Sequence, residues 1–504
     1  MNHYLTFDYG TTSIKACLID AELKMLAQCI EEYDLITDGG RIEMSSEDYW
    51  DAMCRAVAHL KTEVSLEQVA AICITTQGET MIPVDAQGNA LSNAVVWLDS
   101  RAGEQAEEIA AVISPEALYE QTGVTDLGGA LPLSKLLWFR EQQPEIYQRA
   151  HRFLLLEDYL VMRLTGQFVT EPSLQTSTGW YSLQTGGYMT ELLRALSLDE
   201  AKLPQILACG ECAGALRQEA AQALGLRENV RVVMGAMDQI AAAIGGGGLQ
   251  PGFLTATIGT AMVMTCSYNA SALPQPPMIV YRGYAPQQRV LLPFCPAAGI
   301  VFKWLKDTVF AAEARKCAEE NQNIYDTLCA LATTAPAGAG GLTLLPYFSG
   351  SLQPKLLPEA SGVFFGLTLS TGKAELVRAV LESIGFMLRE NLELLRSLGV
   401  DAKRVHFFGG GSKNAFWNRM IADITGTELV LMEQNECGSM GAAMLAAVQM
   451  GDWETITEAQ RCNRIAQIVR PNAQVHAVYE PFYRRYQQVF QCNEILFQKG
   501  TKSI

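Results

Sequence analysis

The sequence from residue 4 to residue 20 reads Tyr4-Leu5-Thr6-Phe7-Asp8-Tyr9-Gly10-Thr11-Thr12-Ser13-Ile14-Lys15-Ala16-Cys17-Leu18-Ile19-Asp20. Two β-type runs flank a Gly-Thr-Thr-Ser turn, with an acid ending the first run and a base in the second. Glycine lets the backbone come close to a bound anion, and successive turn N–H groups form a concave phosphate site. The stretch predicts either a phosphate-binding hairpin or an ordinary hairpin with a polar turn, and alone it favours the ordinary one.

A second stretch repeats this design near the middle of the chain and reads Ala256-Thr257-Ile258-Gly259-Thr260-Ala261-Met262-Val263-Met264. It is again an apolar run, a Gly-Thr turn and an apolar run. Two such hairpins indicate a duplicated fold with a nucleotide between its halves, an arrangement that resembles actin, the hexokinases and the ATPase lobes of large heat-shock chaperones. We therefore predict an α/β fold with two actin-like (ribonuclease H-like) lobes and a nucleotide cleft between them.

The composition limits the kinds of protein that this chain can be. Its 504 residues are too many for one ordinary core and enough for two large lobes. A hydrophobic share of 49% and a charged share of 18% are typical of globular proteins. The net charge of −16 disfavours a nucleic-acid surface, which needs a basic patch, but it leaves a local phosphate site open.

The apolar runs are short, and no basic region precedes an apolar stretch near the N-terminus, so we expect no membrane partner, no membrane span and no signal peptide. Thirteen cysteines are scattered along the chain and indicate reduced thiols and a cytoplasmic location. The Cys209-Gly210-Glu211-Cys212 motif has no second pair, so it is interpreted as a loop coincidence.

The order of secondary structure predicts alternating strands and helices. Gly245-Gly246-Gly247-Gly248 is the best lobe boundary, because four consecutive glycines suit a hinge or a close-packed backbone. We therefore predict lobes at residues 1–246 and 247–504. The expected strands lie near 3–9, 14–20, 25–31 and 69–75, and the clearest helices span 46–60 and 374–398.

Three further segments carry possible chemistry or packing. Phe408-Gly409-Gly410-Gly411-Ser412-Lys413-Asn414 is a strand-to-helix turn whose glycines would let a base or a phosphate approach the backbone. Asp238 stands at a strand-to-helix transition and is either a helix cap or an acid that accepts the proton of an attacking hydroxyl. The small residues of the segment 436–446 predict a closely packed helix without chemistry.

The order of these five segments resembles the FGGY family of carbohydrate kinases, which includes glycerol, xylulose, ribulose, fuculose and gluconate kinases. The resemblance runs over nearly the whole chain. It implies a phosphotransferase that uses ATP and Mg²⁺ to phosphorylate a hydroxyl of a small sugar or polyol. It also implies a sugar-binding and phosphate-binding N-terminal lobe, a nucleotide-binding C-terminal lobe and a possible homodimer.

The resemblance assigns roles to individual residues. Asp238 would be the general base and Asp8 would lie by the Mg²⁺ ion. The implied ATP-binding residues are Thr11, Thr12, Ser13, Lys15, Gly259, Thr260, Gly299, Lys303, Gly410, Gly411 and Asn414. The implied substrate-binding residues are Gln77, Gly78, Glu79, Trp97, Asp238 and Gln239.

Some positions depart from the family pattern. Glycerol kinases carry Arg-Glu and xylulose kinases Met-His at Gly78 and Glu79, so ketose, polyol and sugar acid all stay open. The segment 351–361 lacks two bases and an acid that relatives commonly have, which we interpret as loss of an internal ion network. Two other functions stay open as well: an actin-like nucleotide switch without catalysis, and a weakly active kinase that senses sugar.

Overall fold

The computed structural model describes residues 2–250, 252–270, 272–353 and 355–499. The chain forms two units, and each is built from three stretches of sequence. Unit 1 contains the chain up to Gly247 together with Ser267–Leu291 and Glu436–Asn463. Unit 2 contains Gly248–Cys266, Leu292–Asn435 and the chain from Arg464 onward. The chain first passes from unit 1 to unit 2 after Gly247, one residue beyond the predicted boundary, and two later segments return to unit 1.

The main sheet of unit 1 has the strand order β12-β13-β6-β1-β2-β3. The strands β1, β2 and β3 form an antiparallel meander, β6 runs parallel to β1, and β13 runs parallel to β6. Their bounds are β1 (His3–Tyr9), β2 (Ser13–Asp20), β3 (Met25–Glu32), β6 (Val69–Thr76), β12 (Cys212–Ala215) and β13 (Arg231–Val233). The strands predicted from the sequence are all present.

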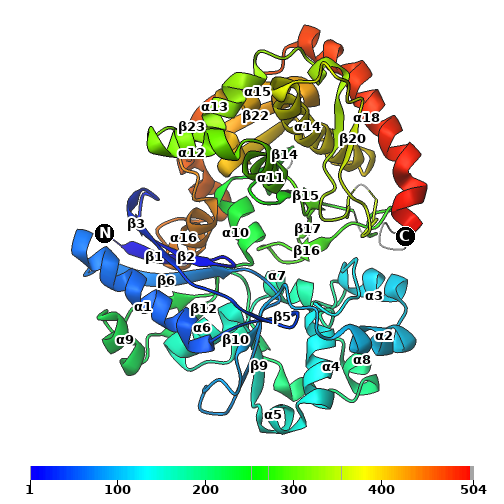
Figure 1. Ribbon diagram of the computed structural model, residues 1–504. Coiled ribbons are helices and arrows are strands. Elements are labelled where there is room, and N and C mark those ends of the chain that lie inside the picture. The colour runs from blue at the N-terminus through cyan, green and yellow to red at the C-terminus, as the bar shows by residue number, and fades with distance from the viewer. Residues whose placement is uncertain (1, 251, 271, 354, 500–504) are drawn as a thin grey trace. The chain divides into compact units, whose positions relative to one another are not determined.

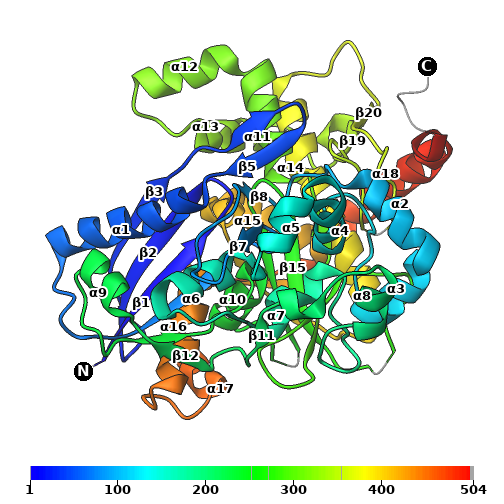
Figure 2. The same cartoon turned by 90° about the horizontal axis from the view of Figure 1, so that it is seen from below.

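Alternation of side chains along β1 and β2 gives this sheet two different faces. Leu5, Phe7 and Tyr9 pack into the hydrophobic core with Ile14 and Ala16. The core is completed by α1 (Ser46–Glu63) and α6 (Leu156–Thr165), while α16 (Cys437–Gln449) contacts β1 and β6. Figures 1 and 2 show α1 lying along β2 and β3, with α16 on the other face of the sheet. Asp8 and Lys15 have the opposite parity to the core residues and therefore belong to the α16 face.

Unit 2 repeats this topology. β14 and β15 are antiparallel, β18 pairs with β15, β21 runs parallel to β14, β22 runs parallel to β21, and β23 closes the edge antiparallel to β22. Their bounds are β14 (Phe253–Ile258), β15 (Met262–Tyr268), β18 (Phe294–Cys295), β21 (Arg404–Phe408), β22 (Glu428–Met432) and β23 (Ile465–Val469). The duplication predicted from the two Gly-Thr hairpins is confirmed, because β1–β2 and β14–β15 occupy equivalent places in the two sheets.

The remaining elements surround these sheets. The other strands of unit 1 are β4 (Ile36–Asp38), β5 (Arg41–Met44), β7 (Met81–Val84), β8 (Ala94–Val95), β9 (Arg152–Leu155), β10 (Val169–Thr170), β11 (Gln205–Ile206), β16 (Val280–Arg282) and β17 (Arg289–Leu291). Its other helices are α2 (Gly103–Val112), α3 (Pro115–Thr122), α4 (Pro132–Gln142), α5 (Pro144–Arg149), α7 (Pro172–Gln175), α8 (Thr190–Ala195), α9 (Gln218–Leu224), α10 (Asp238–Gly245) and α17 (Ile456–Ala459).

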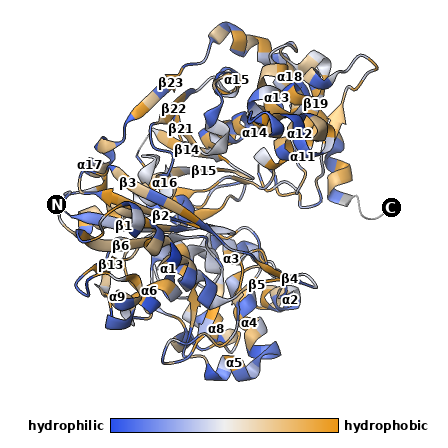
Figure 3. Cartoon of the chain, turned by 60° about the vertical axis from the view of Figure 1, so that its left-hand side comes forward, coloured by the Kyte–Doolittle hydropathy of each residue, from blue (hydrophilic) through white to orange (hydrophobic). Residues whose placement is uncertain are grey.

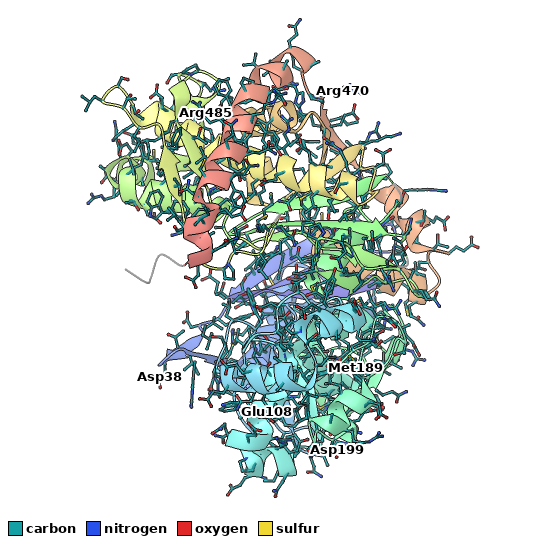
Figure 4. The ribbon with its side chains drawn as sticks, turned by 90° about the vertical axis from the view of Figure 1, so that its right-hand side faces the viewer. Asp38, Glu108, Met189, Asp199, Arg470 and Arg485 are labelled. Carbon is teal, nitrogen blue, oxygen red and sulfur yellow. The ribbon has the colours of Figure 1, made fainter. Side chains whose placement is uncertain are left out.

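Unit 2 has a helical layer over its sheet. It adds β19 (Thr343–Leu345), β20 (Val363–Phe365), α11 (Gly299–Val309), α12 (Ala311–Glu319), α13 (Ile324–Ala332), α14 (Lys373–Ser397), α15 (Ala415–Thr425) and α18 (Ala473–Lys499). The long helix predicted at 374–398 is α14. Figure 4 labels Arg470 just before α18 and Arg485 on it, and α18 contacts α14 and α15.

The hydrophobic residues concentrate where strands and helices pack (Figure 3). The helices α10 and α16 pack closely, as their small residues predict. A Cβ atom on Gly441 would lie 1.9 Å from Ala241 O, and one on Gly245 would lie 2.0 Å from Cys437 O. In the part of the chain that the structure describes, every helix is too short or too polar to span a bilayer.

Candidate functional sites in the two units

Three parallel strands of unit 1 end at the same edge of the sheet and present polar residues there. Asp8 on β1 is in register with Thr75 on β6, and Thr76 forms a parallel bridge with Met237, which follows β13. Asp8, the segment 77–79 and Asp238 therefore follow or end three neighbouring strands. The carboxyl ends of parallel strands are where open α/β sheets bind ligands.

Asp8 lies in a charged cluster at this edge. It faces Lys15 across the β1–β2 pair, and Lys15 forms an ion pair with Glu436 at the start of α16. A Cβ atom on Gly438 would lie 2.6 Å from Asp8 Oδ2, so only glycine lets α16 approach this carboxylate. Partial burial raises the pKa of Asp8 to about 6, with Lys15 opposing the shift. Nowhere in the described ranges do three or more His, Cys, Asp or Glu side chains gather to hold a metal ion by themselves.

The turn of the first hairpin is fixed from outside by two aromatic residues. Gly10 N donates to Ser13 O (3.0 Å), and the Tyr33 hydroxyl donates to Gly10 O (2.5 Å) and Ser13 O (3.1 Å). The indole N–H of Trp97 donates to Thr11 Oγ1 (3.1 Å). Thr12 is exposed. Trp97, which the family resemblance assigned to the substrate, thus contacts the turn predicted to bind phosphate.

Asp238 is the first residue of α10, and Met237 rather than Asp238 is the helix cap. The turn before it is tight, because a Cβ atom on Gly235 would lie 1.7 Å from Ile74 O. Buried side chains hold this turn: Glu157 accepts from Gly235 N (2.8 Å) and Ser173 Oγ accepts from Met237 N (3.0 Å).

The carboxyl group of Asp238 is partly exposed and accepts a hydrogen bond from Gln239 N (2.6 Å). Partial burial, followed by the charge of Asp8, raises the pKa of Asp238 to about 7, and the bond from Gln239 opposes this shift. A carboxylate with a pKa near the working pH suits general base catalysis.

Glu79 adopts an unusual backbone conformation. Its φ is +68°, and Thr80 N donates to Gly78 O (2.9 Å) across it, which makes residues 78–80 a γ-turn. This turn is rare and strained for a residue with a side chain. Gly78, the residue before Glu79, leaves room for the side chain of Ser177, because a Cβ atom at position 78 would lie 3.2 Å from Ser177 Oγ. A larger residue at position 78 would push Ser177.

Lys135 on α4 holds this γ-turn from behind. Its side chain is fully buried, and Nζ donates to Val96 O (3.0 Å) and to Glu79 O (3.4 Å). Burial lowers the pKa of Lys135 and raises that of Glu79, while the attraction between the two charges opposes both shifts. Sequence reasoning missed Lys135, although a lysine between Ser134 and Leu136 in an apolar helix is an available signal.

A cavity of about 120 Å³ opens beside Glu79 in unit 1. Its walls come from Glu79, the segment 123–131, Thr176, Ser177 and Ile279–Tyr281. Of the predicted substrate residues, only Glu79 lines this cavity. Gly78 lies next to Ser177, which is part of the wall. The other predicted substrate residues do not line the cavity: Gln77, Trp97, Asp238 and Gln239. Asp126, Ser177 and Tyr281 were missed because they lie far from the motifs in sequence, and Tyr281 comes from a segment that returns to unit 1.

Unit 2 contains a larger cavity, of about 390 Å³, beside the second hairpin. Its walls include every ATP-binding residue that was predicted in this unit: Gly259, Thr260, Gly299, Lys303, Gly410, Gly411 and Asn414. The aromatic residues Phe302, Tyr325 and Trp417 also line it. The sequence did not single out these aromatic residues, which offer flat apolar surfaces.

Glycines let the backbone segments around this cavity meet. A Cβ atom on Gly299 would lie 2.2 Å from Gly259 O, and one on Gly411 would lie 2.8 Å from Ile258 Cβ. Asn414 caps α15 by accepting from Phe416 N (3.1 Å) and Trp417 N (3.2 Å), and it donates to Asp326 Oδ1 (2.9 Å). Lys303 is exposed and pairs with Asp307 at 2.7 Å.

Comparison with known proteins agrees with this architecture. Residues 3–245 match the N-terminal domain of the FGGY family of carbohydrate kinases, and residues 254–450 match its C-terminal domain. The chain belongs to the FGGY family of carbohydrate kinases. It is therefore a sugar kinase, a phosphotransferase with an alcohol group as acceptor, and membership implies the use of ATP.

This kinase is similar to xylulose kinases and to a gluconate kinase. A xylulose kinase of Escherichia coli (strain K12) is 29% identical over 493 residues, which cover 96% of this chain and 99% of the relative. A solved xylulose kinase structure and a solved gluconate kinase structure, both from Lactobacillus acidophilus, are each 25% identical to this chain with a TM-score of 0.90. Each of the two comparisons covers 99% of this chain. The match spans 100% of the xylulose kinase chain and 99% of the gluconate kinase chain. Overall similarity therefore does not select between a ketose and a sugar acid for this kinase.

Proposed function

We propose that this kinase transfers the γ-phosphoryl group of ATP to a hydroxyl of a small sugar or polyol, with Asp238 as the general base. The observation that carries the proposal is the meeting of Asp8, Glu79 and Asp238 at one edge of the unit 1 sheet. Glu79 would accept hydrogen bonds from substrate hydroxyls, and Asp238 would accept the proton of the reacting one.

The nucleotide would bind in the cavity of unit 2. The volume of this cavity, about 390 Å³, lies in the range of small-molecule sites. The close backbone approaches at Gly299 and Gly411, and the start of α15, offer main-chain groups to the nucleotide. The apolar faces of Phe302 and Tyr325 would contact the adenine base.

The sequence prediction for the phosphate contacts is kept in the proposal and comprises Thr11, Thr12, Ser13, Lys15, Gly259 and Thr260. Lys15 is ion-paired with Glu436, so phosphate binding would share or replace that pair. Gln77, Gly78, Trp97 and Gln239 would border the substrate, as predicted from the sequence.

Asp8 fits the role of a Mg²⁺ ligand. It is a partly exposed carboxylate beside the turn predicted to bind phosphate, and protein Mg²⁺ sites usually combine one or two carboxylates with waters and phosphate oxygens. Mg²⁺ bound with ATP would neutralise charge on the phosphates.

Phosphoryl transfer is the proposed chemical step. The substrate O–H proton passes to the Asp238 carboxylate, the hydroxyl oxygen forms a bond to the γ-phosphorus, and the bond from that phosphorus to the β–γ bridging oxygen breaks. ADP leaves with the electron pair of that bond. Because the carboxyl group has a pKa near 7, it can release the proton to water after transfer.

The experiment that tests this function is a coupled ADP-release assay with ATP and Mg²⁺ over a panel of polyols, ketoses and aldonates. We expect ADP formation that depends on one class of these compounds, with the sugar phosphate identified by mass spectrometry. Nucleotide turnover that no panel member accelerates would contradict the proposal and favour an actin-like nucleotide switch.

A further inference from the structure

The cavity beside Glu79 carries an unusual charge distribution. Glu79 lies in its wall and Asp126 at its exposed rim, and the other residues that line it are uncharged. Burial raises the pKa of Glu79; the charge of Lys135 opposes this shift and the charge of Asp126 adds to it. Burial also raises the pKa of Tyr281, and the charges of Glu79 and Asp238 add to that shift. The charges of Glu79, Asp126 and Asp238 therefore all influence ionisable groups that line this cavity.

Three cationic side chains of unit 1, those of Lys135, Arg282 and Arg101, have partners of their own and lie outside the cavity lining. The Lys135 amine donates to Val96 O and Glu79 O behind the γ-turn. The Arg282 guanidinium donates to Leu183 O (2.6 Å), and Arg101 pairs with Asp99 at 2.6 Å and Glu43 at 2.7 Å. None of these three residues lines the cavity.

The uncharged groups of the cavity suit hydroxyls. Burial and its acidic neighbours keep the Tyr281 phenol protonated, so its O–H can donate as well as accept. Ser177 and Thr176 add two hydroxyl groups. Carboxylates accept hydrogen bonds only, so a ligand that offers several O–H donors satisfies them, whereas a ligand carboxylate adds a like charge and brings no donor.

We propose that this cavity selects an uncharged polyhydroxylated substrate, a ketose or polyol, and rejects sugar acids by like-charge repulsion from Glu79 and Asp126. The inference rests on the proposed function only in taking this cavity as the sugar site. It separates the substrate classes that the named relatives leave open, because it depends on this chain's own side chains.

The test measures binding without nucleotide, so that it does not depend on turnover. Isothermal titration would compare ligands that differ only by oxidation of one terminal CH₂OH to a carboxylate, such as xylitol with xylonate and sorbitol with gluconate, and would include xylulose as a ketose. We expect at least one neutral ligand to bind at least tenfold more tightly than its matched acid at pH 8.

Variants locate the cause of the discrimination. Asp126→Asn removes one charge at the exposed rim, so folding should be unaffected, and the preference for the neutral ligand should fall at least threefold. Asp38→Asn is the matched control, since Asp38 is an exposed carboxylate at the tip of the β4–β5 hairpin (Figure 4) and should leave the preference unchanged.

Each outcome bears on a different claim. An acid that binds as tightly as its neutral partner, or a panel in which neither class binds, would overturn the inference. An unchanged preference in Asp126→Asn would overturn the assigned cause. Neutral ligands that bind selectively but are not phosphorylated would leave the inference standing and contradict the proposed function.

Discussion

The two cavities of this kinase are built by different means. The cavity of unit 2 is shaped by backbone segments that meet at glycines, such as Gly259 and Gly299. The cavity of unit 1 is shaped by side chains from four separate stretches, with Glu79 held in a strained turn. Family membership implies the use of ATP, and main-chain geometry suffices to hold one constant ligand in the proposed nucleotide cavity. In the proposed sugar cavity, side chains must distinguish one acceptor from another. This contrast predicts that substitutions in one cavity affect one ligand only.

Among substitutions that test the contrast between the two cavities, the largest effect is expected from Gly299→Ala. Its Cβ atom would lie 2.2 Å from Gly259 O, and overpacking of this kind costs about 3 kcal/mol if the two segments stay in place. Separation of the two segments relieves that cost but deforms the nucleotide cavity, so we expect nucleotide affinity to fall by up to roughly a hundredfold. Titration with ADP should show this loss, while sugar binding should be retained. Gly103→Ala is the control, since its Cβ atom would also meet nothing within 4 Å and Gly103 lines neither cavity. Nucleotide binding by Gly299→Ala at the wild-type level would contradict the account of this cavity.

This contrast also explains how much the sequence predicts. The duplicated sheets could be predicted because each Gly-Thr hairpin is a short strand-turn segment whose geometry is local. The residues assigned to ATP in unit 2 came from the family resemblance, and the structure places them in the lining of one cavity. The cavity residues Asp126, Ser177 and Tyr281 could not be predicted. They line one cavity because the segment 267–291, which contains Tyr281, returns to unit 1. The strain at Glu79 could not be predicted either, because it depends on Thr80 and on Lys135, which is distant in sequence.

Lys135→Met is expected to weaken sugar binding by about tenfold or more. Hydrogen bonds from charged groups contribute about 1.5–3 kcal/mol, and their loss would release the backbone of Glu79. Lys61→Met is the control, because Lys61 also donates to two backbone carbonyls of unit 1, Leu224 O (2.6 Å) and Gly225 O (3.0 Å). The affinity for ADP should not change in either variant. Equal effects of the two substitutions on sugar binding would show that Lys135 is merely structural.

The pH dependence of the reaction is expected to follow Asp238. Its pKa is raised to about 7, so below pH 7 the carboxyl group is protonated and cannot accept the substrate proton. The value of kcat/KM should reach a plateau above about pH 8 and fall by about tenfold for each unit of pH below 7. A profile that stays flat from pH 5.5 to 8.5 would be inconsistent with this role.

The smallest effect is expected from relief of the strain at Glu79. Glu79→Gly and Glu79→Ala both remove the carboxylate, so both should lose sugar affinity, but only glycine adopts φ = +68° without cost. The free energy of unfolding should be greater for the glycine variant by about 1 kcal/mol, as measured by urea denaturation. An alanine variant of equal or greater stability would show that the γ-turn is not strained.

The most direct test of the central claim compares wild-type kinase with Asp238→Asn. Sugar-dependent ADP formation and ADP binding would be measured on the same preparations. The asparagine keeps the size of the side chain and removes the proton acceptor, so phosphorylation should fall by at least about a hundredfold while nucleotide affinity stays at the wild-type value. Phosphorylation by Asp238→Asn at the wild-type rate would contradict the assignment of Asp238 as the general base.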